Sequence, residues 1–219
     1  MAEWTLYEGD CLEVMRGMQD NSVDVIVTDP PYGVNYDTGE TFMPGEFANV
    51  LPLALPELYR ILRPDGAIFV FSSSRNLADW ALRFQIYFKL QNILVWDKEK
   101  DSGCWSPSSF AFQYEPILFG LKGKRKLTAR FSDVIRCKPP RGRERVHPTQ
   151  KPVDLCRILI RSVARPGMLV YDPFAGSGTT LVAAYKEGVD SIGSELNPEY
   201  CNIIRQRMAA LQQPLPLEK

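Results

Sequence analysis

Two kinds of apolar pattern alternate along the chain, one typical of strands and one typical of helices. Ser22–Thr28 is a β-branched run, and Ala67–Phe71 is too apolar to be half-exposed, so both indicate buried strands. In Glu46–Leu62, by contrast, apolar residues recur every three or four positions, as on one face of a helix. Pro52 and Pro56 within that stretch argue against a single straight helix.

The same patterns along the whole chain predict an α/β fold. Strands are expected at Trp4–Glu8, Ser22–Thr28, Ala67–Phe71, Asn92–Trp96, Glu115–Leu121, Met168–Tyr171 and Ser191–Gly193. Helices are expected at Glu46–Leu62, Asn76–Phe88, Val153–Ala164, Gly178–Glu187 and Pro198–Gln212. Stretches 33–45, 97–111 and 122–150 have no such pattern. Alternating strands and helices predict a mainly parallel sheet with helices on both faces, and 219 residues suit one domain, 1–219.

The tetrapeptide Asp29-Pro30-Pro31-Tyr32 follows the second predicted strand. Two prolines fix the backbone and remove two N–H donors, so the segment presents carbonyl acceptors beside the carboxylate of Asp29. Such acceptors suit an amino group held by both of its hydrogens, and Tyr32 offers a flat face for a planar ring. The alternative is a rigid turn with a buried tyrosine.

The segment from Asp172 to Thr179 (DPFAGSGT) ends another strand and opens a helix. Gly176 and Gly178 allow a ligand close to the backbone, and the free N–H groups of a helix start favour an anionic group. By itself the pattern also fits a tight turn. However, Glu195 ends the next strand, 19 positions after Gly176, where an acidic residue binds ribose hydroxyls. An adenosine-containing cofactor is therefore expected.

Composition narrows the class of protein. The chain is 45% hydrophobic and 24% charged, no apolar stretch approaches membrane-spanning length, and the N-terminus shows no basic leader. We therefore expect a cytoplasmic, nucleoid-associated protein without membrane contact. The five cysteines lie far apart without a C-x-x-C pair, so we expect reduced, structural cysteines and no metal site.

Charge is strongly segregated although 26 basic and 26 acidic residues cancel overall. The window from Lys122 to Arg145 holds ten basic residues against Asp133 and Glu144, so it carries +8 (10 − 2) and the rest of the chain carries −8. A solvated charge run is the alternative, but phosphate contacts explain ten cations in one loop-like segment better. The candidate DNA-binding residues are Lys122, Lys124, Arg125, Lys126, Arg130, Arg136, Lys138, Arg141, Arg143 and Arg145.

These motifs together resemble the β group of S-adenosylmethionine-dependent DNA amino-methyltransferases, in which the catalytic motif precedes the cofactor motif. The matching elements span nearly the whole chain: Gly9 to Leu12, Asp29 to Tyr32, His147 to Pro152, Asp172 to Thr179, Glu195, and Asn197 to Tyr200. The resemblance implies a Rossmann-like methyltransferase domain with a mostly parallel seven-stranded sheet and S-adenosyl-L-methionine as cofactor. It also places a small target-recognition insertion at residues 122–146.

The resemblance also assigns roles to site residues. Asp29 and the Pro30 carbonyl would accept the hydrogens of the target amine, Pro31 would complete the motif, and Tyr32 would stack on the flipped base. Asp10 and Cys11, in a loop, would meet the cofactor adenine, and Thr149, Gln150 and Lys151 its methionine end. The full cofactor set is Asp10, Cys11, Asp29, Thr149, Gln150, Lys151, Asp172, Phe174, Gly176, Ser177, Gly178, Thr179, Glu195 and Asn197. His147, the single histidine, belongs to the cofactor loop and not to proton transfer.

The substrate expected from the resemblance is DNA. A recognition segment this small predicts a short or relaxed target sequence, in which Arg141, Arg143 and Arg145 address guanine edges. A homodimer and a restriction endonuclease of the same system are the protein partners left open.

Several alternatives are kept beside adenine-N6 methylation. Asp29 favours adenine because cytosine-N4 enzymes of the family more often begin the motif with serine, which makes cytosine-N4 the second choice. Related pockets with asparagine first act on protein glutamines, which the +8 window disfavours, and RNA enzymes share the scaffold. A non-catalytic nucleic-acid-binding subunit is the alternative of another class, although this chain keeps both the tetrapeptide and the glycines.

Overall fold

The computed structural model describes residues 2–31, 50–100, 107, 110–142, 145–147 and 149–212. Tyr32, Arg143 and Glu144, all named above, lie outside the described residues, as do Pro148 and positions 46–49 of the predicted helix. None of the helices within the described ranges is long and apolar enough to cross a membrane.

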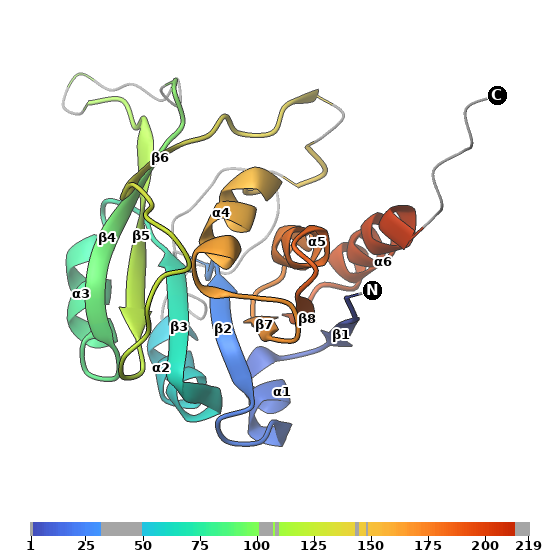
Figure 1. Ribbon diagram of the computed structural model, residues 1–219. Helices are drawn as coiled ribbons and strands as arrows, with labels where there is room; N and C mark the ends of the chain where they lie inside the picture. Colours follow the sequence, from blue (N-terminus) through green and yellow to red (C-terminus); the bar gives the residue numbers. More distant parts are fainter. Residues whose placement is uncertain are drawn as a thin grey trace.

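The described strands form one eight-stranded sheet (Figure 1). They are β1 (Trp4–Glu8), β2 (Val23–Thr28), β3 (Leu62–Phe71), β4 (Lys89–Asp97), β5 (Tyr114–Leu121), β6 (Val134–Arg136), β7 (Leu169–Asp172) and β8 (Asp190–Glu195). The order across the sheet is β1-β8-β7-β2-β3-β5-β4-β6. Every neighbouring pair is parallel except the two that include β5, which runs antiparallel to β3 and β4. The predicted mainly parallel α/β sheet is confirmed.

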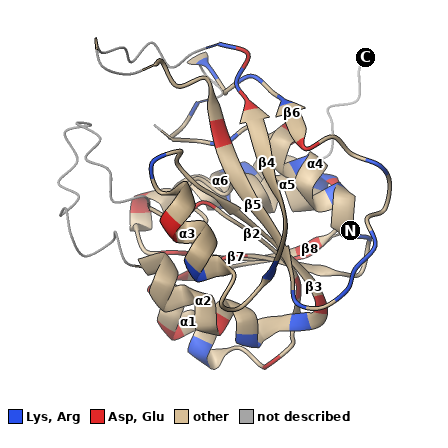
Figure 2. Cartoon of the chain, turned by 90° about the vertical axis from the view of Figure 1, so that its left-hand side faces the viewer, with Lys and Arg blue, Asp and Glu red and all other residues tan. Residues whose placement is uncertain are grey.

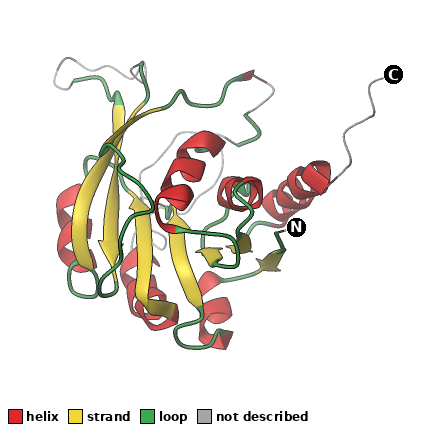
Figure 3. Ribbon diagram, in the orientation of Figure 1, coloured by secondary structure: helices red, strands yellow, loops and turns green. Residues whose placement is uncertain are grey.

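Helices cover both faces of the sheet (Figure 3). They are α1 (Cys11–Gly17), α2 (Val50–Ile61) and α3 (Leu77–Phe84) on one face, and α4 (Val153–Val163), α5 (Thr179–Lys186) and α6 (Pro198–Gln212) on the other. Two cores result. Val25 and Val27 of β2 pack with Leu159 of α4, whereas Ile26 points to the other face and packs with Leu55 of α2. All three β2 residues are fully buried, as an uninterrupted apolar strand requires.

Two elements of the structure were not predicted. Asp10 and Cys11 were expected in a loop, but Cys11 begins α1 and Asp10 is its N-cap, accepting a hydrogen bond from the Leu12 N–H at 2.7 Å. Strand β6 lies in a stretch without periodic pattern, because three residues are too few to show one. It exists through pairing with the end of β4, so the sheet has eight strands and not seven.

The topology brings one end of every parallel strand to the same edge of the sheet. β2, β3, β7 and β8 end there at Thr28, Phe71, Asp172 and Glu195. The antiparallel β5 starts at this edge, since Ile117 pairs with Phe71. We call it the carboxyl edge. It is the position at which open α/β sheets bind ligands.

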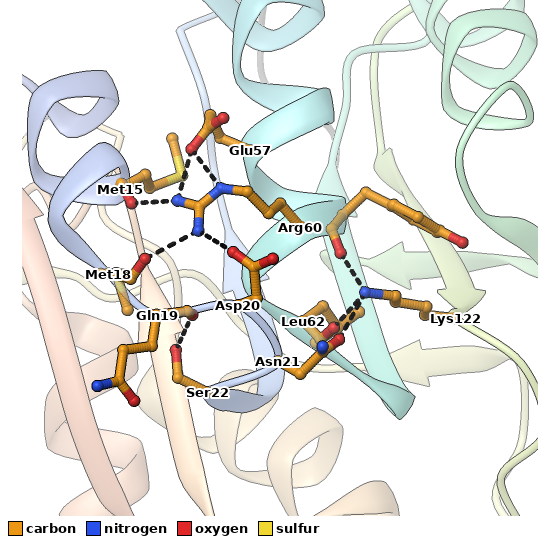
Figure 4. Close-up of polar contacts among 11 residues, drawn as sticks. Met15, Met18, Gln19, Asp20, Asn21, Ser22, Glu57, Arg60, Leu62 and Lys122 are labelled. Carbon is orange, nitrogen blue, oxygen red and sulfur yellow. Dashed lines mark hydrogen bonds and ion pairs between the residues drawn. The ribbon is translucent and has the colours of Figure 1, made fainter.

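The opposite, amino edge is held by cations (Figure 4). The guanidinium of Arg60 donates to the carbonyls of Met15 at 2.6 Å and Met18 at 2.8 Å and pairs with Glu57 at 2.7 Å. These contacts tie the end of α1 to α2. An arginine that satisfies helix-end carbonyls and a carboxylate together stabilises the junction.

Lys122, the first cation of the basic window, also lies at the amino edge (Figure 4). Its ammonium donates to the Asn21 side chain at 2.9 Å and to the carbonyls of Tyr59 and Leu62, each at 2.7 Å. Burial lowers the pKa of Lys122, since desolvation disfavours the charged form. Lys122 was a candidate DNA-binding residue, but in the structure its ammonium is bound by three oxygen acceptors of the protein.

Replacing Lys122 by methionine is expected to lower the free energy of unfolding by about 1 to 2 kcal/mol, because three oxygens lose a charged donor. Urea unfolding followed by circular dichroism measures the change. Lys126→Met is the matched control, because Lys126 is exposed, and a surface substitution should shift stability by less than about 0.5 kcal/mol. Equal effects of the two variants would contradict a structural role for Lys122.

Candidate active site

The glycine-rich loop between β7 and α5 is shaped by its two glycines. Gly176 and Gly178 have φ angles of 53° and 79°, in the left-handed region where side chains are disfavoured. A Cβ on Gly178 would lie 2.9 Å from the Ile204 side chain, whereas a Cβ on Gly176 would meet nothing within 4 Å. Gly178 is therefore required for packing against α6. Gly176 leaves its side of the loop open to a ligand.

Glu195 at the end of β8 holds this loop in place. Its carboxylate accepts hydrogen bonds from the Gly176 N–H at 2.7 Å and the Asn197 N–H at 2.9 Å. Burial raises the pKa of Glu195, although these N–H donors work in the opposite direction. A carboxylate has about four lone-pair sites, so two donors leave capacity for ligand hydroxyls. Glu195 and the glycine loop are thus in direct contact, and binding of ribose hydroxyls by Glu195 stays a prediction.

Asp10 and Cys11 lie beside the same strand end. The Gly9 N–H donates to the Glu195 carbonyl at 2.9 Å, which fixes the start of α1 next to β8. The Cys11 side chain is buried, and burial together with the Asp10 charge raises its pKa to about 12. A protonated, buried thiol is a packing group and not a nucleophile.

Asp172 supports the loop from below. It is 3% exposed and accepts a hydrogen bond from the Phe174 N–H at 3.1 Å. Burial raises its pKa to about 7, against the opposing effect of hydrogen bonds from Thr180 and Phe174. On the far side of the loop, Arg207 of α6 donates to the Ser177 carbonyl at 2.6 Å. The loop is thus fixed from both sides.

Asp29, directly after β2, and the segment before α4 meet through an ion pair. The Lys151 ammonium lies 2.5 Å from the Asp29 carboxylate, although the two residues are 122 positions apart. The Lys151 side chain is 7% exposed and that of Asp29 is 24% exposed. Burial would lower the pKa of Lys151, but Asp29 and Glu115 outweigh it and raise that pKa. Lys151 is therefore charged, and the Asp29 carboxylate keeps access to solvent.

Two further charged residues, which the sequence analysis did not single out, continue this pair. Glu115 of β5 lies 3.3 Å from the Lys151 ammonium and 2.6 Å from that of Lys98. Burial opposes ionisation of Glu115, but the two cations outweigh it and lower its pKa. The available signal was a single carboxylate at the start of an otherwise apolar buried strand, YEPILFGL.

The segment before Lys151 is folded on itself. The Thr149 N–H donates to Nδ1 of His147 at 3.2 Å, and the Gln150 side chain accepts from the Val146 N–H at 2.8 Å. The His147 ring packs edge-on against Tyr200 of α6, with 4.4 Å between ring centroids. Through these contacts His147 holds the segment before Lys151 against α6. Contact of Thr149 and Gln150 with a cofactor stays a prediction.

The structure divides the basic window between the two edges of the sheet (Figure 2). Lys122 and Arg125 are at the amino edge, where the Arg125 guanidinium donates to the carbonyls of Asp24 at 3.1 Å and Asp65 at 3.0 Å. Arg136 follows β6 to the carboxyl edge and lies 3.5 Å from Asp97. The other described cations are exposed: Lys124, Lys126, Arg130, Lys138, Arg141 and Arg145.

The buried carboxyl of Asp172 makes a testable contribution to stability. Its pKa of about 7 lies above the value of about 4 expected in the unfolded chain. Stability is therefore lost as pH rises between these values, because the unfolded state releases the proton first. In Asp172→Asn this loss is absent. Relative to the wild type, the variant should gain roughly 2 to 3 kcal/mol between pH 5 and pH 8.

Urea unfolding of cofactor-free wild type and Asp172→Asn across that range measures the difference. Asp65→Asn, at an exposed position, is the control and should show no such trend. A constant difference between wild type and Asp172→Asn would contradict the assignment of the raised pKa.

Comparisons with known proteins identify the family of the chain. Residues 23–206 match the family model described as DNA methylase. YubD of Escherichia coli strain K12, a predicted methylase, is 34% identical over 215 residues, which cover 95% of this chain and 91% of YubD. The DNA adenine methyltransferase YhdJ of the same strain is 28% identical over 243 residues, covering 93% of this chain and 82% of YhdJ.

Solved structures share the fold. TTHA0409 of Thermus thermophilus, determined in complex with S-adenosyl-L-methionine, superposes with a TM-score of 0.73 at 25% identity, covering 99% of this chain and 98% of that protein. The cytosine-N4-specific PvuII DNA methyltransferase gives a TM-score of 0.77 at 19% identity, covering 94% and 86%, which concerns the fold alone. Because the family model matches residues 23–206 and YubD is 34% identical over nearly the whole chain, the chain belongs to the DNA methylase family.

Proposed function

We propose that the protein transfers the methyl group of S-adenosyl-L-methionine to the N6 amine of adenine in DNA. The observation that carries this proposal is the partly exposed Asp29 carboxylate, fixed by Lys151 at the carboxyl edge that also holds the glycine loop. An acceptor for an amine and a cradle for an adenosine-containing cofactor thereby share one edge of the sheet.

The residues present fit the cofactor. Gly176 leaves an open face, the N–H groups at the start of α5 favour a carboxylate, and Glu195 retains acceptor capacity for ribose hydroxyls. Asp10 and Cys11 lie beside Glu195, where the adenine is expected. When bound, S-adenosyl-L-methionine supplies an activated methyl group on its sulfonium.

Catalysis by the chain rests on positioning and on charge. An exocyclic amine is a weak nucleophile because its lone pair is delocalised into the ring. Hydrogen bonds from both amine hydrogens to the Asp29 carboxylate and the Pro30 carbonyl localise that lone pair and orient it. As the N–C bond forms and the bond from the methyl group to the sulfonium sulfur breaks, positive charge passes to the amine, where the Asp29 carboxylate stabilises it. The thioether S-adenosylhomocysteine would leave, and the methylated amine would then release one proton to solvent. Lys151, expected beside the cofactor, serves in this scheme to fix Asp29.

The target base leaves the duplex to reach such a pocket. Unstacking costs a few kcal/mol, and stacking on an aromatic ring such as that proposed for Tyr32 recovers about 1 to 3 kcal/mol. The exposed cations near the carboxyl edge, Arg136 and Lys138, with Arg141 and Arg145, are proposed to contact phosphates or guanine edges. Lys122 and Arg125 are left out of this DNA-contact set, since their donors hold backbone carbonyls at the other edge.

Adenine is preferred over cytosine because the catalytic motif begins with Asp29, and the similar YhdJ is named an adenine methyltransferase. Cytosine-N4 methylation is the second candidate, since the fold is shared with PvuII. Mass spectrometry of nucleosides from DNA of cells that express the chain separates the two. N6-methyladenine is the expected product, and N4-methylcytosine would establish the second candidate. If the DNA contained neither modified base, the proposed reaction would be contradicted.

Asp29→Ala is expected to reduce methyl transfer to background while cofactor affinity stays within a few-fold of the wild type, because Asp29 acts on the target amine. Transfer of labelled methyl to unmethylated DNA measures activity, and isothermal titration with S-adenosyl-L-methionine measures binding. Loss of cofactor binding in Asp29→Ala would refute this division of roles.

The double variant Lys138→Gln/Arg141→Gln is expected to weaken DNA binding and to reduce the slope of log affinity against log salt by about two, roughly 0.9 for each lost phosphate contact. Fluorescence anisotropy of a labelled duplex at several salt concentrations gives the slope. Lys122→Met is the control and should leave the slope unchanged, since its ammonium is engaged at the amino edge. If Lys122→Met reduced the slope as much as the double variant does, the DNA contacts would not be confined to the carboxyl edge.

A further inference from the structure

The Asp29 carboxylate is the first of four charged side chains that contact one another in series, with alternating sign. Asp29 pairs with Lys151 at 2.5 Å, Lys151 with Glu115 at 3.3 Å, and Glu115 with Lys98 at 2.6 Å. They come from four places in the sequence: the end of β2, the segment before α4, the start of β5 and the end of β4. The order is negative, positive, negative, positive.

The two cations are also seated on aromatic rings. The Lys151 ammonium lies 5.3 Å from the centroid of the Phe71 ring, and that of Lys98 lies 5.1 Å from Trp96. The side chains of Lys151, Lys98 and Glu115 are 7%, 17% and 21% exposed. Moving charges this far out of water is costly unless each one is paired. Glu115 is the second carboxylate beside Lys151 and also pairs with Lys98.

The charge on Lys151 has a consequence for the reaction. A lone ammonium at 2.5 Å from Asp29 would offset much of the negative charge that the amine needs when it becomes cationic. Glu115, on another side of the same ammonium, offsets the lysine charge in turn. Glu115 therefore offsets part of the Lys151 charge, although Lys98 offsets part of the Glu115 charge in turn, so Asp29 keeps more negative charge than it would beside a lone ammonium.

We propose that Glu115 is a positioning residue for the methyl transfer: it holds the Lys151 ammonium in a fixed place and offsets its charge, so that Asp29 is oriented and retains its negative charge toward the target amine. Lys98 in turn orients Glu115. The inference rests on the proposed function, because that function gives Asp29 its role. The ion pairs themselves are present whatever reaction the protein catalyses.

Other titratable groups near Asp29 are buried and interact with its charge. Asp172 of β7 and Cys156 of α4 each interact electrostatically with Asp29, and burial raises the pKa of both. The groups that interact electrostatically with Asp29 are thus Lys151, Asp172 and Cys156. Of these, Lys151 forms an ion pair with Asp29, and it also contacts Glu115.

The first test measures Asp29 itself by ¹³C NMR of labelled carboxyl groups, with Asp29→Asn used to assign the resonance. In Lys151→Met, removal of a positive charge should move the titration of Asp29 to higher pH by about one unit or more. In Glu115→Gln, removal of a negative charge should keep Asp29 ionised to lower pH than in the wild type. Glu57→Gln, which breaks a comparable pair with Arg60 at the amino edge, should leave the resonance unchanged.

The second test asks whether Glu115 acts through Lys151. Single-turnover methyl transfer should fall roughly tenfold in Glu115→Gln, as for a charge effect worth about one pKa unit, with KM for S-adenosyl-L-methionine within about twofold. In the Lys151→Met background, Glu115→Gln should add almost no further loss, since residues that act as one unit are not additive. Circular dichroism and urea unfolding identify variants that fail to fold. If Glu115→Gln does not fold, Lys98→Met replaces it. In Lys98→Met the titration of Asp29 should move to higher pH, because a positive charge is removed.

The outcomes separate the two proposals. An Asp29 resonance that does not respond to Glu115→Gln, or to Lys98→Met where that variant takes its place, would overturn the positioning role, as would additive losses in the double variant. Absence of methyl transfer by the wild type on any DNA would defeat the proposed function instead, while the NMR titrations would still decide whether Glu115 acts on Asp29 through Lys151.

Discussion

Burial of the central strands on both faces is the constraint on which the rest of this structure depends. Val25, Ile26 and Val27 of β2 are fully buried between two helical layers, so no polar group can be placed along the middle of the strand without a large desolvation cost. Chemistry is confined to strand ends. In a parallel sheet these ends fall on one edge, where Asp29, Asp172 and Glu195 come together.

The two edges of the sheet use charge in different ways. At the amino edge, Arg60 and Lys122 donate to backbone carbonyls and so close helix and strand ends. At the carboxyl edge, acidic and basic side chains pair with one another, and Lys151, the one buried ammonium among the described residues, is shared between Asp29 and Glu115. The first arrangement stabilises the fold. The second pairs the Asp29 carboxylate with a buried ammonium while leaving it partly open to solvent, as the contact proposed for it with an amine requires.

Local patterns in the sequence predicted most elements because helices and strands of this chain bury a continuous apolar face. They failed where a structure depends on partners far away. β6 is three residues long and exists through pairing with β4, and β3 extends from Ala67 back to Leu62, directly after α2. The case of α1 differs, since Asp10 followed by Glu13 in the first turn was a local helix-start signal that was not used.

The sequence by itself determined the order of the motifs, the glycine loop, the strand-end glutamate and the family resemblance, because each is carried by a few adjacent residues with a fixed backbone role. Only the tertiary structure decided the partners of the charged side chains. Lys151 meets Asp29 across 122 positions, and Lys122 meets Asn21 across 101. Long, flexible side chains reach whichever acceptors the fold brings near, so the basic window divides between two edges. Glu115 joins the site although one carboxylate at the start of an apolar strand does not tell which cations it will meet.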